Sequence, residues 1–199
     1  MSKQVVISIS HKYGCGGHEI GEKLSQKLGV EFVDKEILEK VAEDTNMTYE
    51  AVAKLDEKPR RKFLNKSVKG YSNTPEQNVA DLQFAFMKSK AVADESFVVM
   101  GHCGDQIFKE ICPCVTVFVT GNKADRIKKI AERDNKKPIE ALRFIDKQDK
   151  MAASYHDYYC PNAKWGDANT YDICVNSSVL GIDATVEFLF NFITQFKDK

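Results

Sequence analysis

The chain has 199 residues, a length that suits one domain with a substantial hydrophobic core better than two independent domains. Lysine plus arginine equals aspartate plus glutamate at 29 each, so no overall field favours a nucleic acid polymer or an anionic membrane. The six cysteines are too few and too scattered to indicate a disulfide scaffold. We therefore expect reduced cysteines and anion binding only at local sites.

The N-terminus lacks the features of a targeting segment. Met1 to Gln4 lead directly into an apolar run, without the long apolar region and small-residue cleavage site of a secretory signal. The longest apolar runs, such as Phe97 to Met100, fall short of the roughly 18 residues that a membrane helix needs. These features predict a cytoplasmic protein that does not enter a membrane, and a homo-oligomer is compatible with them.

The first elements are predicted to be a strand, a glycine loop, a helix and a second strand. Val5 to Ile9 is a β-branched run, typical of a strand buried on both faces of a parallel sheet. After the loop, apolar residues recur every four positions from Ile20 to Leu28, which indicates a helix. Gly29 ends this helix before a short strand at Glu31 to Val33.

Three further strands are predicted at Phe97 to Met100, Val115 to Val119 and Tyr171 to Val175, each followed by a helix-like segment. The last helix starts at a predicted cap, Asp183. Its apolar stripe consists of Val186, Leu189, Phe190, Ile193 and Phe196. Strands that alternate with helices predict an α/β fold, a three-layer sandwich with a central parallel sheet of about five strands.

Two stretches interrupt this alternation. Residues 45–75 are polar and include the basic run Lys58 to Arg61, before a helix predicted from Pro75 to about Ala93. Residues 137–170 combine a charged helix, Pro138 to about Ser154, with a loop rich in aromatic residues, Asn and Asp. We interpret the chain as a single domain, 1–199, with a core at 1–44, 95–136 and 171–199, a ligand-covering excursion at 45–94 and a lid-like segment at 137–170.

The loop from His11 to His18 has the composition of a phosphate-binding loop. Its glycines, in Gly14-Cys15-Gly16-Gly17, permit close backbone approach, and the following helix supplies N–H donors. Aligning the second glycine of the common pattern G-x-x-x-x-G-K-[ST] with Gly16 places His11 at the first glycine, Gly17 at the lysine and His18 at Ser/Thr. An ordinary glycine turn is the alternative, because three of the four signature positions differ.

Four ordered segments resemble the cytidylate kinase-like family. They are Ile7 to Ser10 with Tyr13 to Gly21 and Phe32 to Glu36; Val98 to Asp105; Asp149 to Tyr155; and Trp165 to Asp167 with Tyr171-Asp172 and Asn176 to Ser178. The family counterparts include G-S-G-G-R-E-I, V-V-x-G-R-G-A-D and D-K-x-R-A-x-Y. The matches extend over nearly the whole chain, so they are more specific than the loop alone.

The resemblance implies a P-loop nucleotide kinase fold and phosphoryl transfer from ATP, with Mg²⁺, to a nucleoside monophosphate such as CMP or to a similar small acceptor. Donor contacts are expected from His11, Lys12, Tyr13, Gly14, Cys15, Gly16, Gly17, His18 and Glu19. Substrate contacts are expected from Asp34, His102, Asp105, Arg143 and Tyr155 and from the excursion, which then lies on the acceptor side. The candidate catalytic residues are His18, Lys147 and Lys150.

The chain departs from the family at three positions where arginine is expected, His18, His102 and Ala152. Imidazole titrates near pH 6.5 and lacks the bidentate fork of arginine. We hypothesise that bound phosphate raises the pKa of these imidazoles, and a flat pH dependence of nucleotide binding between about 5.5 and 8 would contradict this. The lost charge also supports a second hypothesis, a nucleotide- or phosphometabolite-binding protein or interaction module without turnover. A purely structural α/β domain is a third.

Several of these side chains also have structural interpretations. Asp34 stands where a helix N-cap belongs, which we favour over a role in orienting a ribose or a magnesium-bound water. Cys15 is either a reactive thiol at a helix N-terminus or, as we favour, a small residue that fits the loop. The aromatic residues Tyr155, Tyr158, Tyr159 and Trp165 either stack on a base or anchor their loop. Arg143, Lys147 and Lys150 either reach phosphates when a lid closes or form a solvated helix face. No metal ligands are assigned, because a single C-x-C is a poor zinc signature.

Overall fold

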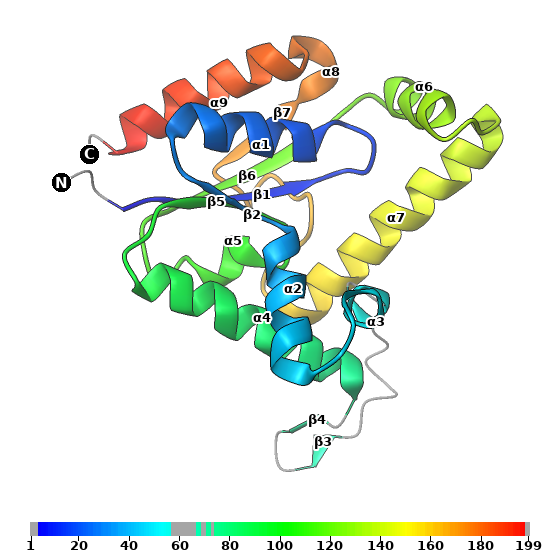
Figure 1. Cartoon of the computed structure of the whole chain (residues 1–199). Coiled ribbons are helices and arrows are strands. Elements are labelled where there is room, and N and C mark those ends of the chain that lie inside the picture. Colours follow the sequence, from blue (N-terminus) through cyan, green and yellow to red (C-terminus); the bar gives the residue numbers. More distant parts are fainter. Residues whose placement is uncertain (1–3, 57–66, 69–70, 73, 198–199) are drawn as a thin grey trace.

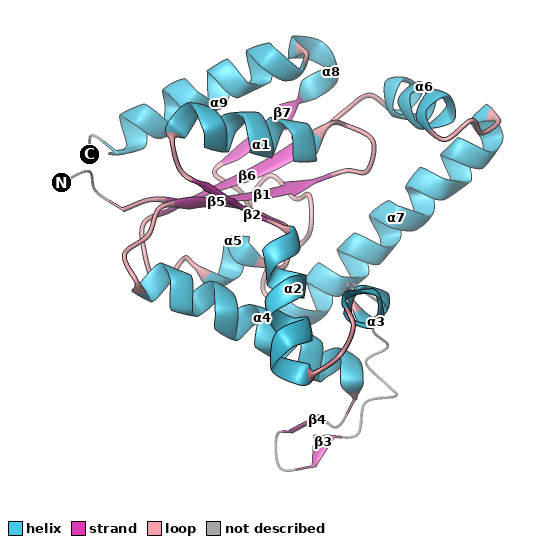
Figure 2. Cartoon of the chain, in the orientation of Figure 1, coloured by secondary structure: helices cyan, strands magenta, loops and turns pink. Residues whose placement is uncertain are grey.

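A five-stranded parallel sheet forms the centre of the protein, with helices on both faces (Figures 1 and 2). The computed structural model describes residues 4–56, 67–68, 71–72 and 74–197. The strands are β1 (Val6–His11), β2 (Glu31–Val33), β5 (Phe97–Met100), β6 (Cys114–Thr120) and β7 (Ile173–Asn176). They lie in the order β2-β5-β1-β6-β7, and every neighbouring pair is parallel. The predicted three-layer parallel sandwich is confirmed.

The helices fall into three groups (Figure 1). One face of the sheet is covered by α1 (Gly17–Leu28), α9 (Ile182–Lys197) and the short α8 (Ser177–Leu180). The other face is covered by α4 (Pro75–Val92) and α5 (Gly104–Ile107), with α2 (Lys35–Thr45) and α3 (Tyr49–Leu55) packed beside α4. At one side of the sheet, α6 (Lys123–Arg133) and α7 (Pro138–Tyr159) pack together. Separately, β3 (Ser67–Val68) pairs antiparallel with β4 (Tyr71–Ser72). None of the described helices combines the length and apolarity needed to cross a bilayer.

The side chains of β1 alternate between two hydrophobic cores. Ile7 and Ile9 belong to the core under α1 and α9, whereas Val6 packs with Phe97 and Phe108 under α4 and α5. All five side chains are fully buried, so β1 is covered on both faces of the sheet.

The carboxyl ends of β1 and β5 diverge at a crevice. After β1 the chain enters α1 on one face of the sheet, and after β5 it enters α5 on the other face (Figure 1). Because these two strands are neighbours, their connections leave an opening between them, the usual ligand position in open α/β sheets. The fold therefore places the glycine loop at this opening.

The structure corrects several element boundaries. Helix α7 continues to Tyr159, past the predicted end near Ser154, and α3 was not predicted. Asp183 does not cap α9, because that helix already begins at Ile182; instead its carboxylate accepts a hydrogen bond from Lys23 at 2.8 Å. The basic run at 58–61 lies outside the described residues. The division into core, excursion and lid stays a prediction.

Candidate phosphate-binding loop and adjoining cavity

The glycine loop between β1 and α1 has a backbone that tolerates no side chain at two positions. Gly16 has a left-handed φ of 84°, and a Cβ there would overlap Cδ1 of Ile182. A Cβ on Gly17 would overlap the His11 side chain. The first turn of α1 follows directly, and its N–H groups have no intrahelical carbonyl partners. The loop thus presents backbone donors at the positive end of a helix dipole.

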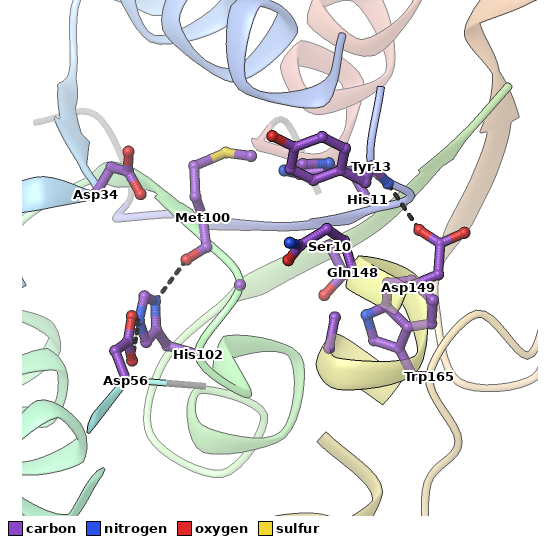
Figure 3. Close-up of a pocket in the computed structure, with 12 residues that line it drawn as sticks. Ser10, His11, Tyr13, Asp34, Asp56, Met100, His102, Gln148, Asp149 and Trp165 are labelled. Carbon is purple, nitrogen blue, oxygen red and sulfur yellow. Dashed lines mark hydrogen bonds and ion pairs between the residues drawn. The ribbon is translucent and has the colours of Figure 1, made fainter. Parts of the chain in front are cut away.

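Arg126 on α6 fixes this loop in place. Its Nε donates to the carbonyl oxygen of Tyr13 at 2.7 Å, and its Nη2 donates to Oδ2 of Asp149 on α7 at 2.6 Å. The N–H of Tyr13 completes the network by donating to Oδ1 of Asp149 at 2.9 Å (Figure 3). Because the Arg126 side chain is only 4% exposed, the network is shielded from water. Two helices therefore hold the loop backbone from the same side.

Other cations of α6 approach the loop as well. The Nζ of Lys129 would lie 3.3 Å from a Cβ on Gly16, and it is 3.8 Å from Glu19. Arg133 donates to the Tyr13 hydroxyl at 3.0 Å. Arg126, Lys129 and Arg133 were not predicted as site residues. Their spacing of three and four residues, which puts them on one face of a helix, is the signal in the sequence that points to them.

Cys15 serves the loop as a buried small residue. Its thiol donates to the carbonyl oxygen of Val119 at 3.5 Å, and its side chain is 6% exposed. Burial raises the pKa of Cys15 to about 11, so the thiol stays protonated at neutral pH. This agrees with the favoured interpretation and argues against a reactive thiol.

A cavity of about 280 Å³ lies beside the loop, at the carboxyl ends of β1 and β5 (Figure 3). The described residues that line it are Ser10, His11, Tyr13, Asp34, Asp56, Met100, Gly101, His102, Gln148, Asp149, Ala152 and Trp165. They include three carboxylates and two imidazoles but no lysine or arginine. Each carboxylate has a cationic or imidazole partner, since Asp34 pairs with His18, Asp56 with His102 and Asp149 with Arg126.

The His102–Asp56 pair lies at one side of the cavity lining, across from Asp149 and Trp165 (Figure 3). Nδ1 of His102 lies 2.9 Å from the carbonyl oxygen of Met100, and Nε2 lies 3.2 Å from Asp56 Oδ1. Both partners are acceptors, so each ring nitrogen faces an oxygen of the protein. His102 is only 7% exposed, which keeps these bonds out of water. As it stands, this imidazole does not present a free donor to a ligand phosphate.

The family model described as the cytidylate kinase-like family matches residues 6–179. The chain belongs to this family. No significant match exists among curated proteins. An uncharacterized protein from Eubacterium ventriosum ATCC 27560 shares 29% sequence identity, with a TM-score of 0.75 over 96% of this chain and 99% of that one.

Two kinases of known title share the fold at lower identity. Shikimate kinase from Bacteroides thetaiotaomicron is 17% identical, with a TM-score of 0.57 over 96% of this chain and 98% of that one. A gluconokinase from Sinorhizobium meliloti 1021 is 14% identical, with a TM-score of 0.51 over 96% of this chain and 99% of that one. These likenesses confirm the P-loop kinase fold predicted for this member of the cytidylate kinase-like family.

The predicted donor-loop residues come together in this family member. His11 and Tyr13 line the cavity, and the N–H of Lys12 donates to Val119 at 2.9 Å. His18 is exposed at the start of α1, and Glu19 pairs with Lys23 at 3.1 Å. Gly14, Cys15, Gly16 and Gly17 form the turn between them. The structure thus gathers the loop residues at the cavity rim, and their contacts with a donor stay a prediction.

The predicted acceptor residues divide into two groups. Asp34 and His102 line the cavity, and their contacts with an acceptor stay a prediction. Asp105 does not, because it is fully buried and accepts from His156 Nε2 at 3.0 Å. Tyr155 is 3% exposed and donates to Gln83 at 3.3 Å, so it anchors α7 to α4. Asp34 occupies the N-cap position of α2, as predicted, but its side chain makes no capping bond and lies 3.0 Å from Nε2 of His18.

The three cations predicted to act from a lid lie on the side of α7 that faces away from the cavity. Gln148, Asp149 and Ala152 face the cavity, whereas Arg143, Lys147 and Lys150 are exposed and line a separate hollow. Their spacing of four and three residues puts these cations on one face of the helix, as predicted. A role for them at the phosphates stays a prediction, and it requires a change in the orientation of α7.

Trp165 combines the two roles considered for the aromatic loop. It lines the cavity, and its ring meets Phe118 edge-on with centroids 5.1 Å apart. Tyr158 and Tyr159 pack on each other at 4.9 Å, and Tyr159 also contacts Phe84. The tyrosines therefore anchor the end of α7, and Trp165 is the aromatic residue placed to contact a ligand.

The described residues form no group of three or more His, Cys, Asp or Glu side chains that could hold a metal ion. The cavity carboxylates are already paired with His18, His102 and Arg126. Kinases bind Mg²⁺ mainly through substrate phosphates and water, with few protein ligands. The residues present therefore fit magnesium that arrives as part of a nucleotide substrate.

Proposed function

We propose that this protein is a phosphotransferase that binds ATP with Mg²⁺ at the glycine loop and transfers its terminal phosphoryl group to a small acceptor in the adjoining cavity. The observation that carries the proposal is the shared wall of the two sites: His11 and Tyr13 belong both to the loop and to the cavity lining. A phosphate held by the loop therefore ends beside the space for an acceptor.

The chemistry asks mainly for positioning and for neutralisation of negative charge. Backbone N–H groups at the start of α1 supply donors, and Lys129 supplies a cation at the edge of the loop. The guanidinium of Arg126 already donates hydrogen bonds to Asp149 and to the Tyr13 carbonyl oxygen. Arg126 therefore acts by holding the loop rather than by contacting the ligand. No general base is required for this reaction class.

A nucleoside monophosphate such as CMP is the first acceptor to test. The described cavity lining offers carboxylates and imidazoles, which suit hydroxyl and amino groups, but no lysine or arginine for an acceptor phosphate. The basic run at 58–61 follows Asp56 closely in the chain and lies outside the described residues. The acceptor screen therefore includes uncharged polyols beside nucleoside monophosphates.

A nucleotide-binding protein without turnover is the second candidate. The observation in its favour is that His18 and His102, which replace family arginines, both direct Nε2 at an aspartate. The third replacement, Ala152, lines the cavity with a methyl group. These changes remove permanent positive charge from the places where the family has it.

Thermal-shift measurements with ATP, GTP and nucleoside monophosphates, each with Mg²⁺, test both candidates. We expect stabilisation by a nucleoside triphosphate, and none by any nucleotide would refute both. A coupled assay for nucleoside diphosphate release then separates the enzyme from the binder.

A matched pair of glycine variants identifies the loop as the binding site. Gly16→Ala and Gly29→Ala both force alanine into a left-handed conformation, with φ of 84° and 66°. Only the first also collides with a neighbour, since nothing lies within 4 Å of a Cβ on Gly29. We expect Gly16→Ala to abolish the nucleotide-induced shift and Gly29→Ala to retain it. Equal losses would contradict the assignment.

The proposal includes the cytoplasm as the location, because ATP is abundant there and thiols stay reduced. The six cysteines all lie in the described part of the chain and form no disulfide there. The proposed partners are small nucleotides and the acceptor, not nucleic acid polymers, and a homo-oligomer remains compatible with it.

A further inference from the structure

The His11 side chain fills the space that belongs to the lysine of the common phosphate-binding loop. Position 17 aligns with that lysine, and position 11 aligns with the first glycine of the pattern. A Cβ on Gly17 would overlap Cβ and Cγ of His11 and would lie 2.8 Å from Cδ2. Relative to the common loop, the large side chain and the glycine have therefore changed places. The absence of a side chain at Gly17 leaves space for the imidazole of His11.

His11 differs from the other three histidines in its hydrogen bonds. In each of the others, Nε2 faces an aspartate; these three are His18, His102 and His156. Nδ1 of His11 lies 3.2 Å from the carbonyl oxygen of Lys12, which only accepts, so Nδ1 carries the hydrogen. Nε2 has no hydrogen-bond partner within the described part of the chain, and the half-buried ring lines the cavity (Figure 3).

We propose that His11 replaces the missing lysine as the side chain that contacts the donor phosphates, and that nucleotide binding is coupled to uptake of a proton at its Nε2. The proton comes from solvent and adds to the Nε2 lone pair, and the resulting N–H donates a hydrogen bond to a phosphate oxygen. No bond to phosphorus forms or breaks in this step. The inference rests on the proposed function, because it requires a nucleotide on the loop.

The charges around His11 set the direction of the coupling. Burial lowers the pKa of His11 below its ordinary value, and the charge of His18 on α1 acts in the same direction. The Lys12 carbonyl and the carboxylates of Asp34, before α2, and Asp149, on α7, raise it by less. The ring is therefore neutral in the free protein at neutral pH. A bound polyphosphate places several negative charges beside it and raises its pKa.

The proposed proton uptake makes the affinity for nucleotide depend on pH. Because the bound state holds one more proton than the free state, affinity for nucleotide falls as pH rises between the free and bound pKa values of His11. The slope approaches tenfold per pH unit for one proton, or about 1.4 kcal/mol. The common loop lysine stays charged over this range, so a loop with lysine gives a nearly flat profile.

Calorimetric titration of the wild-type protein with ATP and Mg²⁺ tests the coupling directly. At a fixed pH near 7, two buffers with different ionisation enthalpies report the number of protons taken up on binding. We expect uptake approaching one proton and its loss in His11→Gln. The same titration of His18→Gln, the variant of the other loop histidine, tells which imidazole takes up the proton, and loss of uptake in that variant alone would overturn the inference. Binding without proton uptake, or unchanged uptake in His11→Gln, would overturn the inference.

An exchange of the two positions tests the geometry. Gly17→Lys alone is expected to lose ATP binding by at least about tenfold, because its side chain collides with His11. The double variant His11→Gly with Gly17→Lys restores the common pattern, and we expect it to recover binding with a flat profile between about pH 5.5 and 8. If Gly17→Lys alone binds as tightly as the double variant, the inference is wrong.

NMR titration of His11 in the wild-type protein, with and without ATP, needs no variant to fold. We expect the pKa of His11 to rise on binding, and an unchanged pKa would overturn the inference. Failure of the inference is distinguishable from failure of the proposed function. If no nucleotide binds, the proposed function is wrong; if ATP binds with neither proton uptake nor a change at His11, only this inference is wrong.

Discussion

Arg126 shows how one buried side chain joins segments that are distant in the chain. Its guanidinium connects α6 to Tyr13 in the loop, 113 residues away, and to Asp149 on α7. The charge is compensated by a carboxylate that also accepts the Tyr13 N–H. Such a network stabilises only when every member is present, because each lost partner leaves a buried group unsatisfied.

Replacing Arg126 tests this network. Arg126→Met keeps much of the aliphatic volume but leaves the Asp149 carboxylate without its cation, so we expect a loss of about 3 kcal/mol in unfolding free energy. Urea denaturation measures it. Arg133→Met is the control, because its ion pair with Asp134 involves a side chain that is 53% exposed, and it is expected to cost less than about 1 kcal/mol. Similar losses in the two variants would contradict the role given to Arg126.

At the scale of elements, an ion pair connects the C-terminal part of α7 to α5. His156 on α7 and Asp105 on α5 form a pair in which the side chains are 4% and 0% exposed. Burial by itself lowers the pKa of His156, but the hydrogen bond and charge of Asp105 outweigh it and raise that pKa to about 9. The imidazole is therefore charged at neutral pH, and the pair fixes the end of the helix that borders the cavity.

This pair predicts a pH-dependent stability. The folded-state pKa of His156 lies above the unfolded value of 6.5, so its contribution is complete below about pH 6.5 and is lost as pH rises through about 9. We expect Asp105→Asn to cost about 3 kcal/mol near pH 6.5 and to flatten the decline up to pH 9. Denaturation at several pH values measures both effects.

Asp34→Asn is the control for that experiment, because the His18–Asp34 pair is exposed, with side chains 53% and 27% accessible. We expect a change below about 1 kcal/mol and no effect on the decline. An equally steep decline in Asp105→Asn and the wild type would show that another group causes it.

At the scale of the whole molecule, a smaller cluster at the end of α7 is continuous with the core of the sheet. Phe84 and Ile107 pack both against the core under α4 and against the cluster around Tyr155 at the end of α7. The excursion and the lid-like segment therefore share side-chain contacts with the core. Such shared packing favours unfolding of the described parts as one unit.

Scanning calorimetry checks this expectation of a single domain. We predict one transition whose calorimetric and van't Hoff enthalpies agree, and which shifts as a whole when ATP and Mg²⁺ are added. Two separate transitions, only one of which responds to nucleotide, would indicate that the excursion or the lid-like segment folds independently.

The sequence was most informative where local pattern and global fold agree. The β-branched run from Val5 to Ile9, the glycines after it and the four-residue period from Ile20 predicted β1, the loop and α1. It was less informative about ends: no breaker follows Ser154, so α7 continues to Tyr159, and α3 is too short to show a period. The loop predicted to bind a ligand lies at the cavity. Asp105 and Tyr155, predicted to contact the substrate, are instead buried away from it, because residue type alone does not show whether a side chain is buried.

The sequence alone determined the α/β fold, the position of the loop and the absence of its lysine, because these depend on periodicity and on residue types a few positions apart. Only the tertiary structure decided the partner of each titratable group. His11, His18, His102 and His156 carry the same side chain, yet one has an open Nε2 and three face aspartates up to 51 residues away. Burial and the charge brought next to an imidazole set its proton affinity, and both arise from packing between distant segments.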